Sequence, residues 1–176
     1  KYSVDKWSCL NEILDYRTNY KQEGNLRLAR NTAEDKIIQN LVKEQKKNGL
    51  EIEYLKNTNE ISEICPSISE NVISASYCPT DGHADPIDTL RAYKEAAQKN
   101  GVIFTNNEEV LEISEKGSKI EYVRTSKRKI FPKFCVLANG IFCNNVLKSI
   151  GKIIPIEIPI VTVIQTEKTN PLLKPV

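Results

Sequence analysis

The 176-residue sequence contains no methionine, only one histidine and one tryptophan, and no long apolar run. Its most apolar window, residues 153–164, is interrupted by two prolines, a glutamate and a threonine, whereas a membrane span needs roughly 18 or more apolar residues. The N-terminus also lacks the apolar core and small-residue cleavage site of a signal peptide. We therefore expect a soluble, cytoplasmic protein with no transmembrane segment. The absence of methionine predicts that the initiator was removed or that the sequence is an internal segment.

Positive and negative charges nearly balance, because the sequence has 25 Lys and Arg residues and 23 Asp and Glu residues, for a formal net charge of only +2. A nucleic-acid-binding domain usually concentrates its basic residues on one face, so this balance argues against a nucleic-acid partner. The nearest approach to a basic cluster is Lys127-Arg128-Lys129, which follows Thr125-Ser126 between two apolar alternations. Such a position is typical of the solvated tip of a β-hairpin.

The sequence has an odd number of cysteines and no C-x-x-C pair; the five are Cys9, Cys65, Cys78, Cys135 and Cys143. Without a secretory signal, this pattern favours reduced, structural cysteines. Cys135 lies in the apolar run 134–138, where a thiol acts as a small hydrophobic group. The single histidine, His83, has only Cys78 close by in sequence, so we expect no metal site.

The first half of the sequence alternates helical and strand patterns. Residues 4–14 place Val4, Trp7, Leu10 and Leu14 on one helical face. Residues 25–30 alternate apolar and polar side chains like a half-buried strand. A helix is predicted from an N-cap at Thr32 to Asn48, with an apolar face formed by Ile37, Ile38, Leu41 and Val42. A short strand (50–54), a helical turn (61–64) and a further strand (72–77) follow.

The second half begins with a helix that Asp85 caps and Pro86 starts, and that ends at Asn100-Gly101. Its buried side is expected to carry Leu90, Tyr93, Ala96 and Ala97. Four short strands are predicted next, at 102–104, 109–114, 120–124 and 129–131, with a turn at Lys116-Gly117-Ser118 between the second and third. The apolar run 134–138 predicts a buried strand, which a turn at Asn139-Gly140, a short helix to Ile150 and a strand pattern at 155–167 follow.

This order of elements predicts a mixed α/β fold with two interleaved units. Residues 86–150 have the pattern of the second half of a nucleotide-binding fold. Residues 18–80 have the pattern of a separate sheet-and-helix unit, to which the tail 155–167 is expected to return.

Four segments, taken in order, also resemble a known family. They are Tyr20–Arg30 with Gly24-Asn25-Leu26-Arg27-Leu28-Ala29, Tyr77–Pro86 with Asp81-Gly82 and Asp85-Pro86, Val102–Val123, and Val136-Leu137-Ala138-Asn139-Gly140. They are similar to segments of the D-amino-acid oxidase and glycine oxidase superfamily of FAD-dependent oxidoreductases. The bacterial branch is the most similar; it includes sarcosine oxidase beta subunits, D-amino-acid and proline dehydrogenases, and the hydrogen cyanide synthase flavoprotein.

The resemblance implies a partial FAD-binding Rossmann-like domain interleaved with a mixed-sheet substrate-binding domain. Residues 1–17 would be a helix of the FAD domain and residues 85–152 its second part. Residues 18–84 would be the first part of the substrate-binding domain, and residues 153–176 would return to it.

One family feature is missing, because no two of the seven glycines stand two residues apart, as the fingerprint G-x-G-x-x-G requires. In the family this fingerprint precedes the point where the sequence starts, and a substrate-binding C-terminal segment follows its end. We therefore expect a partial chain. Without the helix N-terminus that binds the diphosphate, the segment alone should lose much of its affinity for FAD.

The resemblance also implies cofactor contacts. The backbone of Val110, preceded by Glu109, would lie beside the adenine, since a strand edge offers a donor and an acceptor. The turn Ala138-Asn139-Gly140 would touch the cofactor, because glycine lets the main chain approach closely. Without the resemblance, Val110 is simply a core valine and Asn139-Gly140 a common strand-exit turn.

His83 is a weak catalytic candidate, because a histidine titrates near neutrality and could accept a substrate proton. Its loop has a simpler interpretation, in which Asp81-Gly82 forms a turn and Asp85 caps a helix. A structural or interdomain role for His83 is therefore the preferred one.

The leading functional hypothesis is FAD-dependent oxidation of an amino acid or secondary amine of the sarcosine, glycine, proline or D-amino-acid type. Electrons would pass to oxygen or to a partner subunit of a hetero-oligomeric dehydrogenase, and the cofactor would carry the hydride chemistry. The amine branch is preferred because the loop 77–86 resembles it most closely. Two alternatives are an FAD-dependent 2-hydroxy-acid or glycerol-phosphate dehydrogenase and a non-catalytic module of the same fold that has lost the cofactor.

Overall fold

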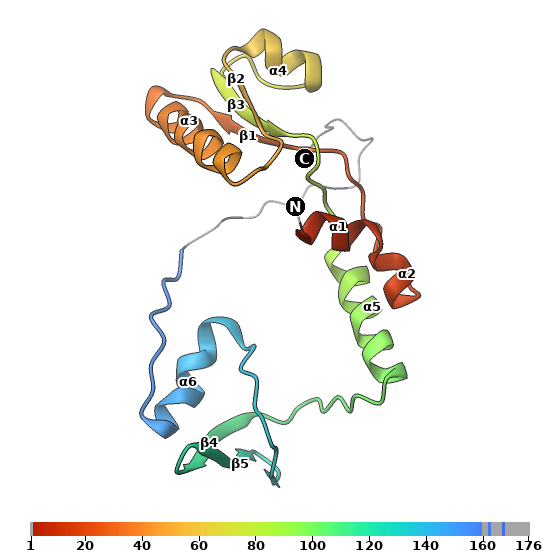
Figure 1. The fold of residues 1–176 in the computed structure, drawn as a ribbon, viewed down its shortest axis with the longest axis vertical. Coiled ribbons are helices and arrows are strands. Elements are labelled where there is room, and N and C mark those ends of the chain that lie inside the picture. Colours follow the sequence, from red (N-terminus) through yellow and green to blue (C-terminus); the bar gives the residue numbers. More distant parts are fainter. Residues whose placement is uncertain (1, 160–161, 163–166, 168–176) are drawn as a thin grey trace. The chain divides into compact units, whose positions relative to one another are not determined.

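The computed structural model of the chain describes residues 2–159, 162 and 167. The described residues form two compact units, with the boundary between Val102 and Ile103 (Figure 1). Each unit combines helices with an antiparallel sheet, so the predicted mixed helix-and-sheet class is confirmed. The domain boundaries predicted at residues 17, 84 and 152 stay predictions.

The first unit is built on a three-stranded sheet with the order β1-β3-β2. The central strand β3 (Ser74–Cys78) pairs antiparallel with β1 (Asn25–Ala29) on one side and with β2 (Glu53–Leu55) on the other. All three predicted strands are confirmed, although β2 begins at Glu53 instead of Leu50. Since β3 has a neighbour on each side, its first three residues are buried.

The helix α3 (Thr32–Lys47) begins one residue earlier than the sequence pattern predicts. The side chain of Asn31 accepts hydrogen bonds from the backbone N–H groups of Ala33 (3.1 Å) and Glu34 (3.0 Å). Asn31 is therefore the N-cap, and the assignment to Thr32 was wrong. Asparagine and threonine both cap helices well, so adjacent candidates compete and the extended backbone at Asn31 decides between them.

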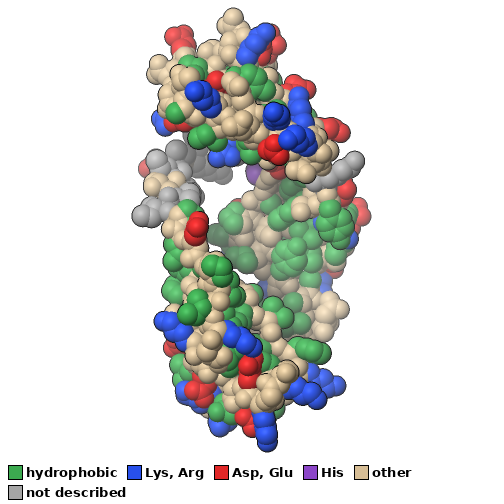
Figure 2. All heavy atoms as spheres, turned by 60° about the vertical axis from the view of Figure 1, so that its left-hand side comes forward, with side chains coloured by type: hydrophobic (Ala, Val, Ile, Leu, Met, Phe, Trp, Pro, Cys, Tyr) green, Lys and Arg blue, Asp and Glu red, His purple; other side chains and the backbone are tan. Residues whose placement is uncertain are grey.

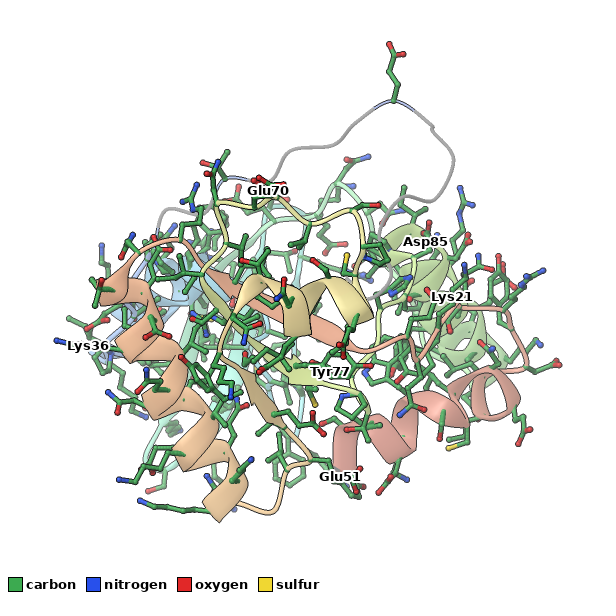
Figure 3. The ribbon with its side chains drawn as sticks, turned by 90° about the horizontal axis from the view of Figure 1, so that it is seen from above. Lys21, Lys36, Glu51, Glu70, Tyr77 and Asp85 are labelled. Carbon is green, nitrogen blue, oxygen red and sulfur yellow. The ribbon has the colours of Figure 1, made fainter. Side chains whose placement is uncertain are left out.

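One face of the sheet packs against α3. Ile38 and Val42 form a buried cluster with Ala29 and Ile52. Ile37, which was predicted to share this buried face, is exposed, because successive residues point about 100° apart around a helix. Lys36 likewise points outward from α3 (Figure 3).

The opposite face of the sheet packs against α4 (Thr58–Ile64). Leu55 belongs to the cluster around the fully buried Ile61, whereas its neighbour Tyr54 packs with the α3 cluster. This alternation is expected, because successive strand residues point to opposite faces. The predicted helical turn at 61–64 is therefore confirmed as the end of a longer helix.

A cluster of three helices, α1 (Tyr2–Ser8), α2 (Leu10–Leu14) and α5 (Pro86–Lys99), completes the first unit. The predicted cap of α5 is confirmed, because the Asp85 side chain accepts hydrogen bonds from the backbone N–H groups of Ile87 (2.8 Å) and Asp88 (2.9 Å). The core of this cluster contains Leu10, Leu14 and Ala92.

The expected buried face of α5 was partly wrong. Leu90 is 71% exposed and Tyr93 is also exposed. The contact with α2 is made instead through Ala92, with Ala96 beside it. Because these alanines stand four residues apart, they form one narrow face on which the helices can approach closely.

The second unit contains the antiparallel meander β4 (Val110–Lys116), β5 (Lys119–Thr125) and β6 (Lys129–Ile130). The turn predicted around Gly117 is confirmed. Helix α6 (Cys143–Leu147), between the 3-10 turns Gly140–Phe142 and Lys148–Ile150, packs on the meander. The core joins Ile113 and Val123 to Val146.

Two predicted strands do not form, at 102–104 and 134–138. Phe134 is 87% exposed, and Ile103 and Val136 are nearly as open. Figure 2, in which all hydrophobic side chains are green, shows many of them at the molecular surface. A strand needs a neighbour for its N–H and C=O groups, and within the described part of the chain neither segment pairs with one. Residues 155–159 of the strand predicted at 155–167 also form none, and most of the remainder lies outside the described residues.

All five cysteines carry free thiols, as predicted, but they differ in exposure. Cys65 and Cys143 are buried, whereas Cys135 is exposed because the run around it is not a buried strand. Over residues 2–159, no helix combines the length and apolarity that crossing a bilayer requires.

Candidate functional site

A pocket of about 450 Å³ lies in the second unit, between the start of β4, the segment before residue 140 and α6. Glu109 and Val110 line it from one segment, and Ala138 and Asn139 line it from another. The structure thus brings together four of the five residues that the family resemblance assigned to the cofactor. The fifth, Gly140, adjoins the lining in sequence.

The walls of this pocket are mainly apolar. Val110, Leu137 and Phe142 contribute to them, and Asn139 and Asn145 add amide groups. The Asn139 amide oxygen accepts a hydrogen bond from the Cys143 thiol (3.1 Å), which holds that side chain in place. Small-molecule sites typically have this size and this combination of apolar walls with a few polar groups. The lining therefore has the character of a small-molecule site.

Gly140 has φ +56°, and a Cβ added to it would meet no atom within 4 Å. Packing within the described chain therefore does not require glycine here, whereas the left-handed backbone favours it. The open space also leaves the main chain accessible to a ligand.

The tip of the β5–β6 hairpin contacts the start of β4. The backbone N–H of Glu109 donates to Ser126 Oγ (3.2 Å), and its carbonyl accepts from the Ser126 N–H (2.8 Å). The neighbouring Glu108 carboxylate pairs with Arg128 and accepts a hydrogen bond from Thr125. The Arg128 guanidinium, and then the Thr125 hydroxyl, lower the pKa of Glu108 from its ordinary value.

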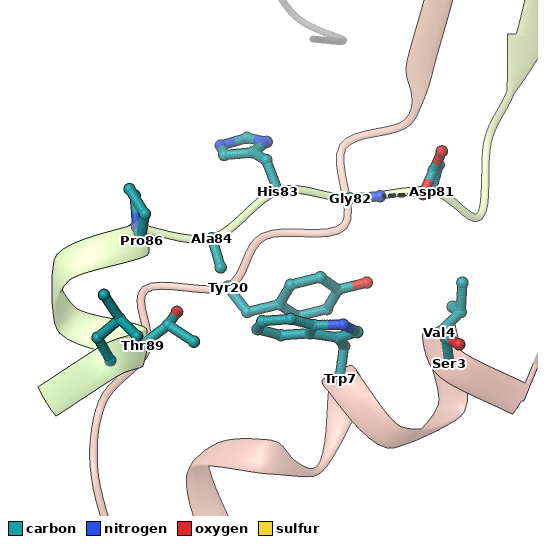
Figure 4. Close-up of a pocket in the computed structure, with 11 residues that line it drawn as sticks. Ser3, Val4, Trp7, Tyr20, Asp81, Gly82, His83, Ala84, Pro86 and Thr89 are labelled. Atoms are coloured by element: carbon teal, nitrogen blue, oxygen red, sulfur yellow. Dashed lines mark hydrogen bonds between the residues drawn. The ribbon is translucent and has the colours of Figure 1, made fainter. Parts of the chain in front are cut away.

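A second pocket, of about 510 Å³, lies in the first unit around the only tryptophan (Figure 4). The rings of Trp7 and Tyr20 stack with their centroids 5.6 Å apart. Burial, and next the charge of Asp81, raise the pKa of Tyr20 above its ordinary value. The His83 ring points away from both aromatic rings (Figure 4).

The loop that contains His83 is bound to the segment that leads into β1. Lys21 and His83 exchange two backbone hydrogen bonds, of 2.8 and 3.0 Å. The His83 imidazole Nε2 lies 3.9 Å from a carboxylate oxygen of Glu23, and its Nδ1 is buried without a partner among the described residues. The backbone bridge gives the loop a structural role, while proton transfer by the His83 side chain stays a prediction.

Two features in and beside the pocket of the second unit were not found from the sequence. Cys135, Val136 and Leu137 line the pocket in the second unit although they were assigned to a buried strand. The ion pair of Glu108 with Arg128 was missed because the two residues are 20 positions apart. Among the residues that the structure covers, no group of three or more His, Cys, Asp and Glu side chains could hold a metal ion.

The family model described as "FAD dependent oxidoreductase" matches residues 1–175. The chain is 33% identical over 84 residues to a D-amino acid dehydrogenase of Helicobacter pylori (strain J99 / ATCC 700824), covering 48% of this chain and 20% of that protein. It is 29% identical over 144 residues to sarcosine oxidase subunit beta of Arthrobacter sp, covering 78% of this chain and 35% of that protein. It is 30% identical over 128 residues to a glycerol 3-phosphate dehydrogenase of Caloramator mitchellensis, with 72% and 26% covered.

Solved structures show the same relationship. Glycine oxidase from Bacillus cereus ATCC 14579 matches with a TM-score of 0.70 and 26% identity, over 84% of this chain and 41% of that one. L-proline dehydrogenase from P. horikoshii matches with a TM-score of 0.73 and 29% identity, over 90% and 41%. The chain thus spans less than half the length of these relatives. Because one family model matches nearly every residue and the fold agrees, the chain belongs to the family of FAD-dependent oxidoreductases.

Proposed function

We propose that this chain supplies part of the FAD site and part of the substrate-binding domain of an enzyme that oxidises an amino acid or a secondary amine. The pocket in the second unit carries this proposal. Two segments, each assigned to the cofactor from the family resemblance alone, meet in it through Glu109, Val110, Ala138 and Asn139. Its apolar lining and size suit the adenosine half of FAD.

Each part of this pocket would have a separate task. Val110 and Leu137 would exclude water from the faces of a bound ring, and the Asn139 amide would offer a polar contact. The open space beside Gly140 would admit the cofactor to the main chain. FAD, when bound, would supply the hydride acceptor for the oxidation, and these residues would supply position and electrostatics.

The same proposal assigns the remaining segments. Residues 18–84, with the β1-β3-β2 sheet, would form the first part of the substrate-binding domain, to which residues 153–176 would return. Residues 1–17 and 85–152 would belong to the FAD domain. A catalytic contribution from His83, as a proton acceptor, would require a substrate to reach its imidazole.

The substrate class is inferred from the relatives. D-amino acid dehydrogenase, sarcosine oxidase subunit beta, glycine oxidase and L-proline dehydrogenase are each named for an amino acid or a secondary amine. A substrate of the sarcosine, glycine, proline or D-amino-acid type is therefore the main proposal. The glycerol 3-phosphate dehydrogenase relative supports a second candidate, oxidation of glycerol phosphate or a 2-hydroxy acid.

The proposal extends to a partner and a compartment. The similarity to a sarcosine oxidase beta subunit supports a partner subunit that receives the electrons. The free thiols of all five cysteines support the cytoplasm, since reducing compartments keep thiols unpaired.

The test is purification of the full-length protein and anaerobic titration with candidate substrates. We expect bound FAD, visible as flavin absorbance, and bleaching by an amino acid or secondary amine. Bleaching by glycerol phosphate or a 2-hydroxy acid alone would favour the second candidate. A folded protein that neither contains nor takes up FAD would support the non-catalytic module.

A further inference from the structure

We propose that Glu108 and Arg128 are positioning residues for the pocket in the second unit. Neither side chain lines that pocket. Their ion pair holds the tip of the β5–β6 hairpin against the residues that open β4, and so sets the position of the pocket wall at Glu109 and Val110. The inference rests on the proposed function, because it concerns the shape of the proposed adenosine site.

The shielding of the Glu108 side chain is the first argument, although the residue as a whole is only partly buried and the Arg128 side chain is 54% exposed. The Glu108 side chain is 6% exposed, the lowest value for a carboxylate among the ion pairs of the described residues. A carboxylate that is shielded from water needs a charged partner and hydrogen bonds. Arg128 meets this need with a two-pronged contact, from Nε at 2.9 Å and from Nη2 at 3.2 Å, to the two carboxylate oxygens. Such planar pairs combine strength with fixed geometry.

The hairpin tip is itself tightly organised around Thr125. Its hydroxyl donates to the Glu108 carboxylate (2.7 Å) and accepts from the backbone N–H groups of Lys127 (3.1 Å) and Arg128 (2.9 Å). The Thr125 N–H donates to the Arg128 carbonyl (2.8 Å). The turn that carries Arg128 is therefore held by its own internal hydrogen bonds, and these fix the direction from which the guanidinium reaches Glu108.

The tip is coupled to the pocket through the next residues of the chain. Ser126 exchanges two hydrogen bonds with the backbone of Glu109, and Thr125 pairs with Val110 in the sheet. Both Glu109 and Val110 line the pocket. Without the Arg128 charge, the Glu108 carboxylate would keep only the hydrogen bond from Thr125, and we expect the backbone that carries the pocket wall to shift.

This arrangement also explains the basic run 127–129, which the sequence assigned to a solvated hairpin tip. Its place at the tip is confirmed. Two of its charges nevertheless have partners, because Arg128 binds Glu108 and Lys129 Nζ lies 4.0 Å from the centre of the Tyr122 ring. The run therefore contributes to the structure of the hairpin.

The test uses the full-length protein, freed of flavin and titrated with FAD and with FMN, which lacks the adenosine half. For Glu108→Gln and Arg128→Gln we expect the FAD dissociation constant to rise about tenfold, with little change for FMN. Glu112→Gln is the matched control, because it breaks a similar ion pair, with Arg124 at 2.8 Å, on the same sheet. This control should keep the wild-type affinity for FAD.

The outcomes separate the two proposals. Wild-type protein that binds no FAD would overturn the proposed function and this inference with it. If wild-type protein binds FAD and the Glu108 and Arg128 variants bind it equally well, only the positioning role is overturned. Equal weakening for FAD and FMN, or an equal effect of Glu112→Gln, would also overturn it. If the glutamine variants fail to fold, Arg128→Lys keeps the charge without the two-pronged contact and should weaken FAD binding selectively.

Discussion

The carboxylate of Asp35 on α3 accepts a hydrogen bond of 2.6 Å from the Tyr54 hydroxyl on β2. Ser74 on β3 donates a second hydrogen bond, of 2.5 Å, to the same oxygen. One side chain therefore ties the long helix of the first unit to two strands of its sheet. The Ser74 hydroxyl, and then the Tyr54 hydroxyl, lower the pKa of Asp35 from its ordinary value.

The first prediction concerns Asp35 and pH. Because its pKa is lower in the folded than in the unfolded state, the Asp35 contribution is fully present above the unfolded pKa, about 4. It is lost as the pH falls through the folded value. Asp35→Asn should lower the urea midpoint at pH 7, and the difference from wild type should shrink toward pH 3. Circular dichroism across urea and pH series measures it. Glu53→Gln, at an exposed position of β2, is the control. If the midpoint difference between Asp35→Asn and wild type does not vary with pH, the prediction is contradicted.

The second prediction compares two neighbouring isoleucines of α3. Ile38 is buried, whereas Ile37 is 58% exposed. Ile38→Ala should cost about 2–5 kcal/mol of unfolding free energy, since it leaves a cavity in the core. Ile37→Ala should change it by less than about 0.5 kcal/mol. Urea unfolding of both variants provides the measurement, and similar losses would show that the assigned face of the helix is wrong.

The third prediction concerns close packing at Gly82. A Cβ there would lie 2.5 Å from the Lys21 carbonyl oxygen and 2.8 Å from the Tyr20 ring. Gly82→Ala should therefore destabilise the first unit by about 1–3 kcal/mol. Displacement of Tyr20 should also change the fluorescence of Trp7, which stacks on it.

Gly49→Ala is the comparison for the Trp7 emission, because the added methyl group would meet no atom within 4 Å; its φ of +77° means that this variant also loses stability, through backbone strain. It should leave the Trp7 emission unchanged. If Gly82→Ala keeps the wild-type Trp7 emission and stability, Gly82 does not pack this closely against Tyr20 and Lys21.

The fourth prediction uses the thiols as reporters of the pocket in the second unit. Cys135 is exposed and lines that pocket, whereas Cys65 is only 1% exposed. Iodoacetamide should therefore label Cys135 much faster than Cys65 in the native full-length protein, as peptide mass spectrometry would reveal. Saturating FAD should slow labelling of Cys135 and leave Cys9 unaffected. Unchanged labelling of Cys135 in the presence of bound FAD would argue against a cofactor in this pocket.

Local features of this protein follow from the sequence by itself. The cap and first turn of α5 depend on Asp85 and Pro86, and the β4–β5 hairpin depends on alternating apolar residues around a glycine turn. These features can be predicted from the sequence because the interacting groups are only a few residues apart. The family, too, is evident from four ordered segments, since together they preserve a spacing that each segment alone does not define.

The tertiary structure decided which apolar surfaces are covered and which charges meet. The run 134–138 has the composition of a buried strand, yet Phe134 is exposed, because strand formation depends on a neighbour that the run itself does not encode. Leu90 was expected on the buried face of α5, but Ala92 makes the contact with α2, because the smaller side chain allows the two helices to approach closely. Likewise, only the fold brings Arg128 to Glu108. Whether a side chain is buried or ion-paired depends on residues that are distant in the sequence. A local sequence pattern describes only one of the two partners in each contact.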